Sequence, residues 1–328
     1  MIRTWNNRYI PEALELWNRE AVKDGYKEFS EETFTELILE NKYFDPETVF
    51  LLFDEDEQLK GFAIGCTGAD LPLGADAGYI TCMVCAEEET GGDSGEERFQ
   101  LLLEALENRF RLLGKRQADV LFFNPMILPW YIPDTAGHEH NNAPGVPTDS
   151  RLHRFLLRRG YKERARECAM YLTLDQFAIP EEIKAKERKA EAEGYRIELY
   201  DPQRHRGMEE MLAGLGNPLW QQQIPGYAAD GAPLIIAAQS GRLAGFAGPV
   251  IRQPNGRAFF AGIGVHPDHE GHGLGTILFF NMCEAFRMVG AEYISLFTGT
   301  ENPARSIYEK AGFRTVKTFA VMRRELEQ

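Results

Sequence analysis

The sequence lacks the long apolar segments of membrane proteins and the paired cysteines of small secreted domains. No apolar run in its 328 residues reaches the roughly 18 that a membrane-spanning helix needs. The 5 cysteines, an odd number, favour a reduced compartment over a disulfide framework. The opening, MIRTWNNRYIPEALELW, has no basic-then-apolar targeting pattern. We therefore expect a cytoplasmic protein that makes no contact with membranes.

Basic residues are also scarce. Lys and Arg total 36 against 50 Asp and Glu, which gives a net charge of −14. This balance argues against nucleic acid as the main partner and is compatible with an acceptor that carries an amine. Because 328 residues are too many for one ordinary core, we expect two domains.

Metal-binding patterns are weak. Cys82 and Cys85 have CxxC spacing but lie in YITCMVCAE, a predicted strand in which residues three apart point to opposite faces. His266, His269 and His272 recur at every third position, but glycines interrupt this segment and no carboxylate–His pattern accompanies it. We expect buried thiols and no bound metal.

The two halves of the chain repeat one plan. VFLLFDEDEQLKGFAIGCTG and PLIIAAQSGRLAGFAGPVI each predict a β-hairpin. A strand, a long helix, another strand, a short helix ending at a Gly-aromatic pair (Gly160–Tyr161 or Gly312–Phe313) and a last strand follow each hairpin. The charged segment PEEIKAKERKAEAE separates the halves and favours a helix. We predict a mixed α/β fold of two tandem units, residues 1–178 and 195–328, joined by a helix over 179–194.

The segment VHPDHEGHGLG, residues 265–275, is the most informative in the chain. It predicts the end of a strand and a glycine-rich turn that opens a helix over 276–289. Free backbone N–H groups at a helix N-terminus bind anions. The segment is not a P-loop, because no Lys-Ser/Thr follows, and it lacks the third small residue of the dinucleotide fingerprint. The alternative is a tight connection between a strand and a helix that binds no ligand.

Glycines also interrupt the strand that leads into this turn. Gly262 and Gly264 in FFAGIGV favour a bulge that separates this strand from the predicted strand over 293–297. The separation would leave backbone groups free for an extended amide ligand, such as the pantetheine arm of coenzyme A. A simple packing role for the glycines is the alternative. Downstream, NPARSIYEKAGF places Asn302 and Tyr308 at a short helix, where the phenol is a candidate proton donor or a core residue.

Together these segments resemble the GCN5-related N-acetyltransferase (GNAT) superfamily, and the repeat resembles a tandem member. The family signature, Gln/Arg-x-x-Gly-x-Gly/Ala, matches Glu270–Gly275, with Glu270 at the Gln/Arg position. The resemblance implies that each unit is a mixed, mostly antiparallel twisted sheet flanked by helices. It also implies that the second unit uses acetyl-CoA as cosubstrate and binds it through Ile263, Gly264, Val265, Gly271, His272, Gly273, Leu274, Gly275, Thr276 and Asn302.

The implied reaction is transfer of an acetyl group to a primary amine of a small molecule or peptide by direct attack, with Tyr308 as general acid. FFAGIGV contains no Asp or Glu, so the general base is not assigned. Glu270 and this missing carboxylate favour the alternative, a CoA- or small-ligand-binding sensor without catalysis. The acceptor, the acyl chain length and the choice between monomer and homodimer stay open.

The first unit is expected to be degenerate. Its corresponding turn, AEEETGGDSGEE, carries clustered carboxylates that would repel a pyrophosphate. Leu156 stands four residues before the Gly-aromatic pair, where the second unit has Tyr308. The insertion over residues 126–149 contains Trp130 and Tyr131, which we expect to wall an acceptor pocket. Packing at the surface is the alternative for both residues.

Overall fold

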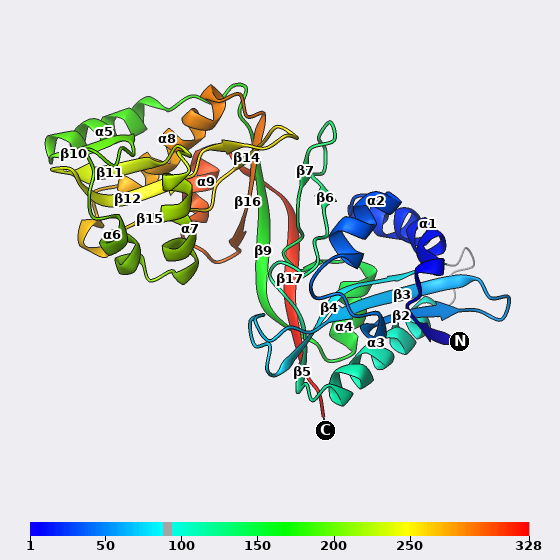
Figure 1. The fold of residues 1–328 in the computed structure, drawn as a ribbon. Helices are drawn as coiled ribbons and strands as arrows, with labels where there is room; N and C mark the ends of the chain where they lie inside the picture. Colours follow the sequence, from blue (N-terminus) through cyan, green and yellow to red (C-terminus); the bar gives the residue numbers. More distant parts are fainter. Residues whose placement is uncertain (88–93, 328) are drawn as a thin grey trace. The chain divides into compact units, whose positions relative to one another are not determined.

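The computed structural model describes residues 1–87 and 94–327. The chain divides into two compact units, each built from more than one segment of the sequence. Figure 1 shows their helices and strands. Unit 1 comprises Met1–Ala169, Phe297–Glu301 and Thr315–Gln328, and unit 2 comprises Met170–Leu296 and Asn302–Arg314.

Unit 1 contains a mixed sheet in the order β1-β2-β3-β4-β5-β17. All neighbours in this order are antiparallel except the parallel pair β4 and β5. Helices α1 and α2 lie on one face of the sheet and α3 lies on the other (Figure 1). The strands are β1 (Ile2–Thr4), β2 (Val49–Phe53), β3 (Leu59–Cys66), β4 (Ala77–Cys85), β5 (Gln117–Val120), β6 (Trp130–Tyr131), β7 (Glu139–His140), β8 (Val146–Pro147) and the first part of β9 (Lys162–Thr173). The α-helices are α1 (Ile10–Glu20), α2 (Glu31–Phe34), α3 (Ser94–Leu112) and α4 (Arg151–Arg158). Short 3-10 helices η1 (Asn7–Tyr9), η2 (Ala21–Asp24) and η4 (Pro46–Thr48) and a π-helix η3 (Thr35–Leu39) complete the unit.

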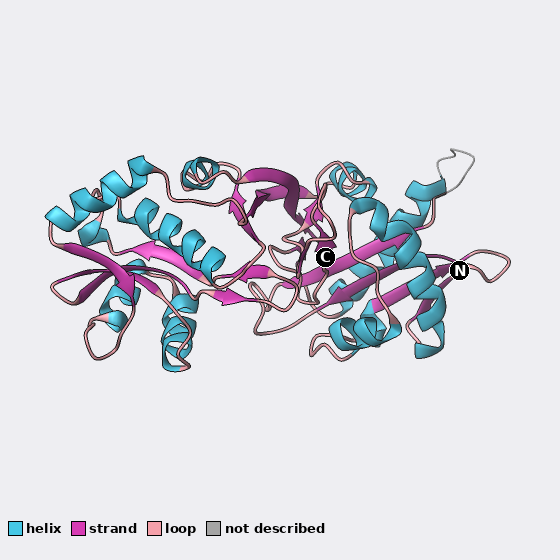
Figure 2. Cartoon of the chain, turned by 90° about the horizontal axis from the view of Figure 1, so that it is seen from above, coloured by secondary structure: helices cyan, strands magenta, loops and turns pink. Residues whose placement is uncertain are grey.

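Unit 2 repeats the plan with a sheet in the order β10-β11-β12-β15, all antiparallel, and a second set of strands in the order β13-β14-β16. Helices again cover both faces of the strands (Figure 2). The strands are β10 (Tyr195–Leu199), β11 (Ile235–Gln239), β12 (Arg242–Gly248), β13 (Ile251–Arg252), β14 (Arg257–Phe259), β15 (Gly262–Val265) and β16 (Tyr293–Gly299). The helices are α5 (Glu181–Ala192), α6 (Met208–Leu215), α7 (Pro218–Ala229), η5 (Pro267–His269), α8 (Leu274–Met288) and α9 (Arg305–Lys310). The prediction of a mixed, mostly antiparallel α/β fold with flanking helices is confirmed.

The last strand of the chain lies mainly in unit 1. Strand β17 (Arg314–Glu325) pairs antiparallel with β5, and Met322 lies opposite Val120. The sequence boundaries, 1–178 and 195–328, place this strand in the second unit instead. The difference arises because the local pattern predicts a strand after each Gly-aromatic pair but does not specify which sheet that strand joins.

Helix α8 carries the core that positions the turn before it. Its segment LGTILFFNMCEAFRM buries apolar side chains against β11, β12 and β15. Ile277, Leu278 and Phe279 are fully buried, which fixes the helix on the sheet. Consequently the N-terminus of α8 is held directly beyond the end of β15.

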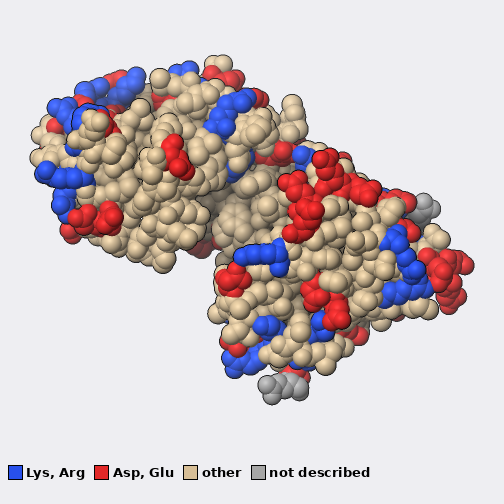
Figure 3. Space-filling view, in the orientation of Figure 1, with Lys and Arg blue, Asp and Glu red and all other residues tan. Residues whose placement is uncertain are grey.

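All of the cysteines, Cys82 and Cys85 among them, are buried free thiols. None of the helices within residues 1–87 and 94–327 has the length and apolar character required to span a bilayer. On the face shown in Figure 3, Lys and Arg side chains are scattered among Asp and Glu.

Candidate functional site

Strands β14 and β15 follow each other in the chain but pair with different neighbours. Strand β14 pairs in parallel with β16, with Arg257 opposite Tyr293 and Ala258 opposite Ile294. Strand β15 pairs only with β12 and ends the order β10-β11-β12-β15, so no described strand occupies its other edge. The structure thus shows the separation that the glycines of FFAGIGV predict, and it leaves an open strand edge.

The hydrogen bonds to β12 determine which backbone groups face this edge. The His266 N–H donates to the Ala244 carbonyl at 2.8 Å. In an antiparallel pair, the backbone N–H and C=O groups of successive residues point alternately toward and away from the neighbouring strand. The amide and carbonyl groups of Gly264 therefore face β12, whereas those of Ile263 and Val265 face the open edge. The backbone of Gly264 is consequently engaged within the sheet, and its predicted contact with a ligand is limited to its Cα face.

Gly262 and Gly264 make room for two side chains from α6 and α7. A Cβ at Gly262 would lie 2.4 Å from the Trp220 ring, and a Cβ at Gly264 would lie 2.7 Å from a Leu215 methyl group. The Trp220 indole N–H also donates to the Ala261 carbonyl at 3.1 Å. Packing and strand separation therefore both contribute to the glycine requirement. The sequence reasoning missed Leu215 and Trp220, which lie far upstream of the motif that they contact.

The turn before α8 is exposed and glycine-dependent. Gly271 has φ +83° and Gly273 has φ +72°, and a Cβ at either would meet nothing within 4 Å. The glycines are required by the left-handed backbone rather than by crowding. Gly273 caps α8 without any side-chain hydrogen bond. No side chain of the described residues accepts a hydrogen bond from the amides of Leu274, Gly275 and Thr276, which fits a bound pyrophosphate.

The three histidines of this turn are neighbours, with the ring centroids of His266 and His269 6.1 Å apart, but their side chains have different partners. His272 Nδ1 lies 2.5 Å from Glu193 Oε2, and His269 Nδ1 lies 2.9 Å from the Tyr195 hydroxyl. His266 packs against α6, where a Cβ on Gly214 would collide with its ring. Burial lowers the pKa of His269, and the neighbouring His266 adds to this effect. No group of His, Cys, Asp or Glu in the described part of the chain is arranged to hold a metal ion.

Tyr308 lies on α9 and is half-buried. Its ring centroid is 4.9 Å from that of Phe279 and 6.1 Å from that of Phe313. Burial raises the pKa of Tyr308, and its hydroxyl makes no hydrogen bond to any described residue. The aromatic neighbours fix the ring while the phenolic oxygen stays available. Asn302 is exposed, and its Oδ1 accepts a hydrogen bond from the Ala304 N–H at 2.9 Å, which shapes the turn before α9.

Comparison with known proteins identifies this half of the chain. Residues 194–313 match the Acetyltransferase (GNAT) family. They form a GNAT domain. The match covers β10 to α9, which includes the separated strands, the glycine turn and Tyr308, so the resemblance seen in the sequence is confirmed. No curated protein matches the chain.

Solved structures extend the likeness of fold to the whole chain. A GCN5-related glucosamine N-acetyltransferase region of a fungal multi-domain GH3 β-N-acetylglucosaminidase has a TM-score of 0.65 at 15% identity and covers 99% of this chain. The chain spans only 38% of that protein. A GCN5-related N-acetyltransferase from Sphaerobacter thermophilus has a TM-score of 0.61 at 15% identity, with 100% of this chain and 96% of the other covered. A tandem GNAT protein from the clavulanic acid biosynthesis pathway has a TM-score of 0.56 at 14% identity, with 100% and 99% covered.

The tandem GNAT fold carries a second separated strand pair in unit 1, but an arginine enters it. Strands β4 and β5 pair in parallel only over Ala77–Tyr79 and Gln117–Asp119. Arg151 Nη1 donates to the Cys85 carbonyl at 3.3 Å, at the end of β4. Residues 88–93 of the predicted acidic turn lie outside the described residues. Leu156 is fully buried, as expected for a core side chain on α4.

The predicted acceptor wall lies in unit 1 and is largely buried. Trp130 is 1% exposed, and its indole N–H donates to the Asn142 carbonyl at 3.3 Å. Its ring centroid lies 5.2 Å from that of Phe319. These contacts make Trp130 a core residue of unit 1 and favour the packing alternative for it. Tyr131 is half-buried, and its contact with an acceptor stays a prediction.

Proposed function

We propose that unit 2 is an acyl-CoA-dependent N-acetyltransferase that moves an acetyl group from acetyl-CoA to a primary amine of a small molecule or peptide. One observation carries the proposal: the uncapped N-terminus of α8 lies at the end of β15, whose second edge has no described partner strand. A carrier with a pyrophosphate and an amide-containing arm matches both features. A small anion without such an arm would bind at the helix N-terminus but would not use the open strand edge.

The residues present fit such a carrier. In this proposal the amides of Gly271–Thr276 receive the pyrophosphate, and the backbone groups of Ile263 and Val265 pair with the arm as an added strand would. His272 and Asn302 flank the site as further contacts. Glu270 is exposed, so its carboxylate can be solvated instead of facing the phosphates. When bound, acetyl-CoA supplies the activated thioester.

The amine must be neutral to attack. A lysine-like amine has a pKa of about 10.4, so at pH 7 only about one molecule in 2,500 is neutral, which corresponds to about 4.6 kcal/mol. Removal from water by the cleft lowers this barrier, and the general base stays unassigned. The Val265 N–H faces the open edge and is placed to polarise the carbonyl oxygen as negative charge develops there.

Tyr308 supplies the proton for the departing thiolate in this proposal. Its raised pKa keeps the phenol protonated at neutral pH, as a donor must be. Donation from an unperturbed phenol of pKa about 10 to a thiolate of pKa about 8.5 is already uphill by about 2 kcal/mol. The raised pKa of Tyr308 adds to this cost, so placement matters more than acid strength. The packing of its ring against Phe279 and Phe313 provides this placement.

Unit 1 is proposed to be non-catalytic. Leu156 cannot donate a proton, and the Arg151 guanidinium lies at the strand end that a pantetheine arm would need. In this proposal the protein lies in the cytoplasm, where acetyl-CoA is available.

The test is thiol release from acetyl-CoA, measured with and without a panel of primary amines that spans polyamines, amino acids, aminoglycosides, amino sugars and peptides. Release that depends on an amine, together with an acetylated product seen by mass spectrometry, supports the proposal. Tight CoA binding without amine-dependent release at any pH between 6 and 9 would instead identify the chain as a sensor.

A further inference from the structure

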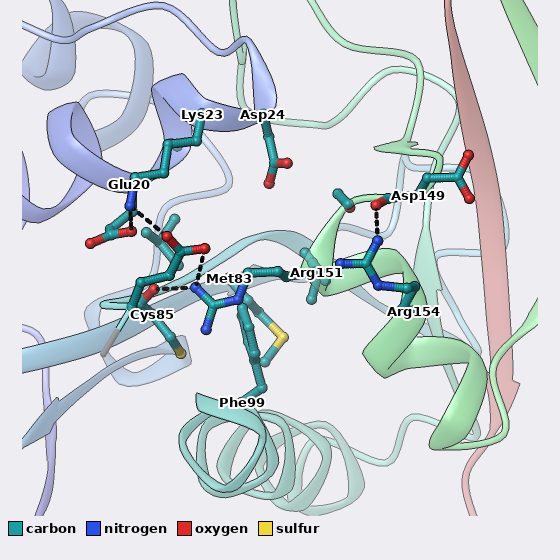
Figure 4. A pocket seen from close by; sticks show the side chains of 14 residues that line it. Glu20, Lys23, Asp24, Met83, Cys85, Phe99, Asp149, Arg151 and Arg154 are labelled. Atoms are coloured by element: carbon teal, nitrogen blue, oxygen red, sulfur yellow. Dashed lines mark hydrogen bonds and ion pairs between the residues drawn. The ribbon is translucent and has the colours of Figure 1, made fainter. Parts of the chain in front are cut away.

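Unit 1 contains a cavity of about 140 Å³ that the proposed reaction does not use (Figure 4). It lies between η2, the end of β4, α3 and the start of α4. Met83, Val84, Phe99 and Leu152 supply apolar surface, and the remaining wall is rich in charged side chains of both signs. This volume is well below the roughly 300–1,000 Å³ of pockets for drug-sized ligands, so the cavity suits a metabolite of a few heavy atoms.

Most of the charged groups in the wall neutralise one another. Lys23 Nζ lies 2.7 Å from Glu20 Oε2 and 2.8 Å from Glu87 Oε2. Arg151 Nη1 lies 3.4 Å from Glu87 Oε1. These four side chains form one connected chain of alternating charge, which needs no ligand for its compensation.

The charged side chains of Asp24 and Arg154 line the cavity but do not belong to this network. The Asp24 carboxylate is half-buried and makes no hydrogen bond or ion pair with the described residues. Burial raises its pKa, and this effect outweighs the opposite effect of the nearby charges of Lys317, Arg151 and Arg154. Lys317 donates to the backbone carbonyl of Asp24 and not to its carboxylate. Arg154 likewise donates to a backbone group, the carbonyl of Asp149, and has no ion pair with a described carboxylate. In Figure 4 both side chains point into the cavity, whereas the carboxylate of Asp149 points away from it.

We propose that this cavity binds a zwitterion of the α-amino-acid type, with its ammonium group on Asp24 and its carboxylate on Arg154. A partly desolvated carboxylate without a partner is unfavourable, and a ligand ammonium removes that penalty. A purely cationic ligand would be repelled by the charge of Arg154, and a purely anionic one by the charge of Asp24. The apolar surface of Phe99 and Met83 accepts the side chain of the amino acid.

The inference concerns unit 1 alone and does not depend on catalysis by unit 2. Arg151 and Glu87 are engaged with each other, so the site offers one acidic and one basic contact rather than a general anion-binding surface. The proposal assigns binding alone, and no chemical step, to this cavity.

Isothermal titration of the full chain with the common α-amino acids, without acetyl-CoA, tests the proposal. At least one free amino acid should bind, and its N-acetyl and carboxamide derivatives should each bind at least about tenfold more weakly, because each lacks one charge. Asp24→Asn and Arg154→Gln should each weaken binding by a similar factor. Asp149→Asn and Arg158→Gln are matched controls and should bind as the wild type does, since Arg158 is paired with Glu96 at 2.9 Å.

A stability measurement separates lost binding from lost folding. Without ligand, Asp24→Asn should unfold at a denaturant concentration equal to or above that of the wild type, because the change removes an unpaired, partly buried charge. The proposal is overturned if no free amino acid binds, if the blocked derivatives bind as tightly, or if the folded Asp24→Asn protein retains wild-type affinity.

Discussion

Gly275 provides the sharpest test of how the turn before α8 works. It lies in the first turn of α8 with ordinary helical geometry, and a Cβ there would meet only a Val265 methyl group, at 3.8 Å. The fold therefore has space for alanine at this position. Alanine in a helix is more favourable than glycine by about 0.5–1 kcal/mol, so Gly275→Ala should raise the free energy of unfolding by about that amount.

The same change should weaken CoA binding. In our account the backbone at Gly275 approaches a pyrophosphate directly, so a methyl group facing the anion would lengthen the N–H contacts. Loss of one or two charge-assisted hydrogen bonds of about 1.5–3 kcal/mol each lowers affinity by at least about tenfold. Stability measured by chemical denaturation and affinity measured by calorimetry should therefore move in opposite directions.

Gly226→Ala is the matched control. Gly226 lies within α7 of the same unit, and a Cβ there would meet nothing within 4 Å. It should give a similar gain in stability with unchanged CoA affinity. Unchanged affinity in Gly275→Ala as well would refute the close approach of a ligand to this turn.

Three other perturbations follow from the site. Tyr308→Phe should reduce kcat by about 10²–10⁴-fold with little change in the Kd of CoA, whereas equal turnover would remove the phenol from the mechanism. Trp220→Ala should destabilise unit 2 by about 2 kcal/mol, because its ring covers Gly262; chemical denaturation measures this, and wild-type stability would contradict the packing role. Folding stability should also depend on His269, whose folded pKa is lowered from 6.5. The unfolded chain then binds the proton more readily, so stability is fully present above pH 6.5 and falls as the pH drops through 6.5 toward the lower folded value. Urea denaturation of the wild type and of His269→Gln checks this, and a parallel loss in both proteins would assign the pH dependence to other groups.

The sequence alone predicted much of this site because its pattern is local. The positive φ angles of Gly271 and Gly273 are a local demand of the turn, visible in EGHGLG, and the strand interruption at Gly262 and Gly264 is visible in FFAGIGV. The periodic burial of α8 and the repeated hairpins are equally local, so the tandem α/β plan could be inferred.

The features that were missed depend on contacts between distant segments. The pairing of β17 with β5 joins residues about two hundred positions apart, and Trp220 reaches Gly262 from a helix whose sequence contains no recognisable motif. Trp130 was expected at a pocket wall, since aromatic residues in a long insertion suit either role. Its ring packs against Phe319 of β17, a contact between distant parts of the sequence that makes Trp130 a core residue.

The central claim is that the main-chain amides at the start of α8 hold a diphosphate while the edge of β15 holds an amide-containing arm. Amide chemical shifts of isotopically labelled protein, recorded during titration with CoA and separately with ADP and with pantetheine, test it most directly. We predict that ADP shifts Gly273, Leu274, Gly275 and Thr276, that pantetheine shifts Ile263 and Val265, and that CoA shifts both sets. Saturable binding of CoA that leaves these amides unmoved would contradict the account.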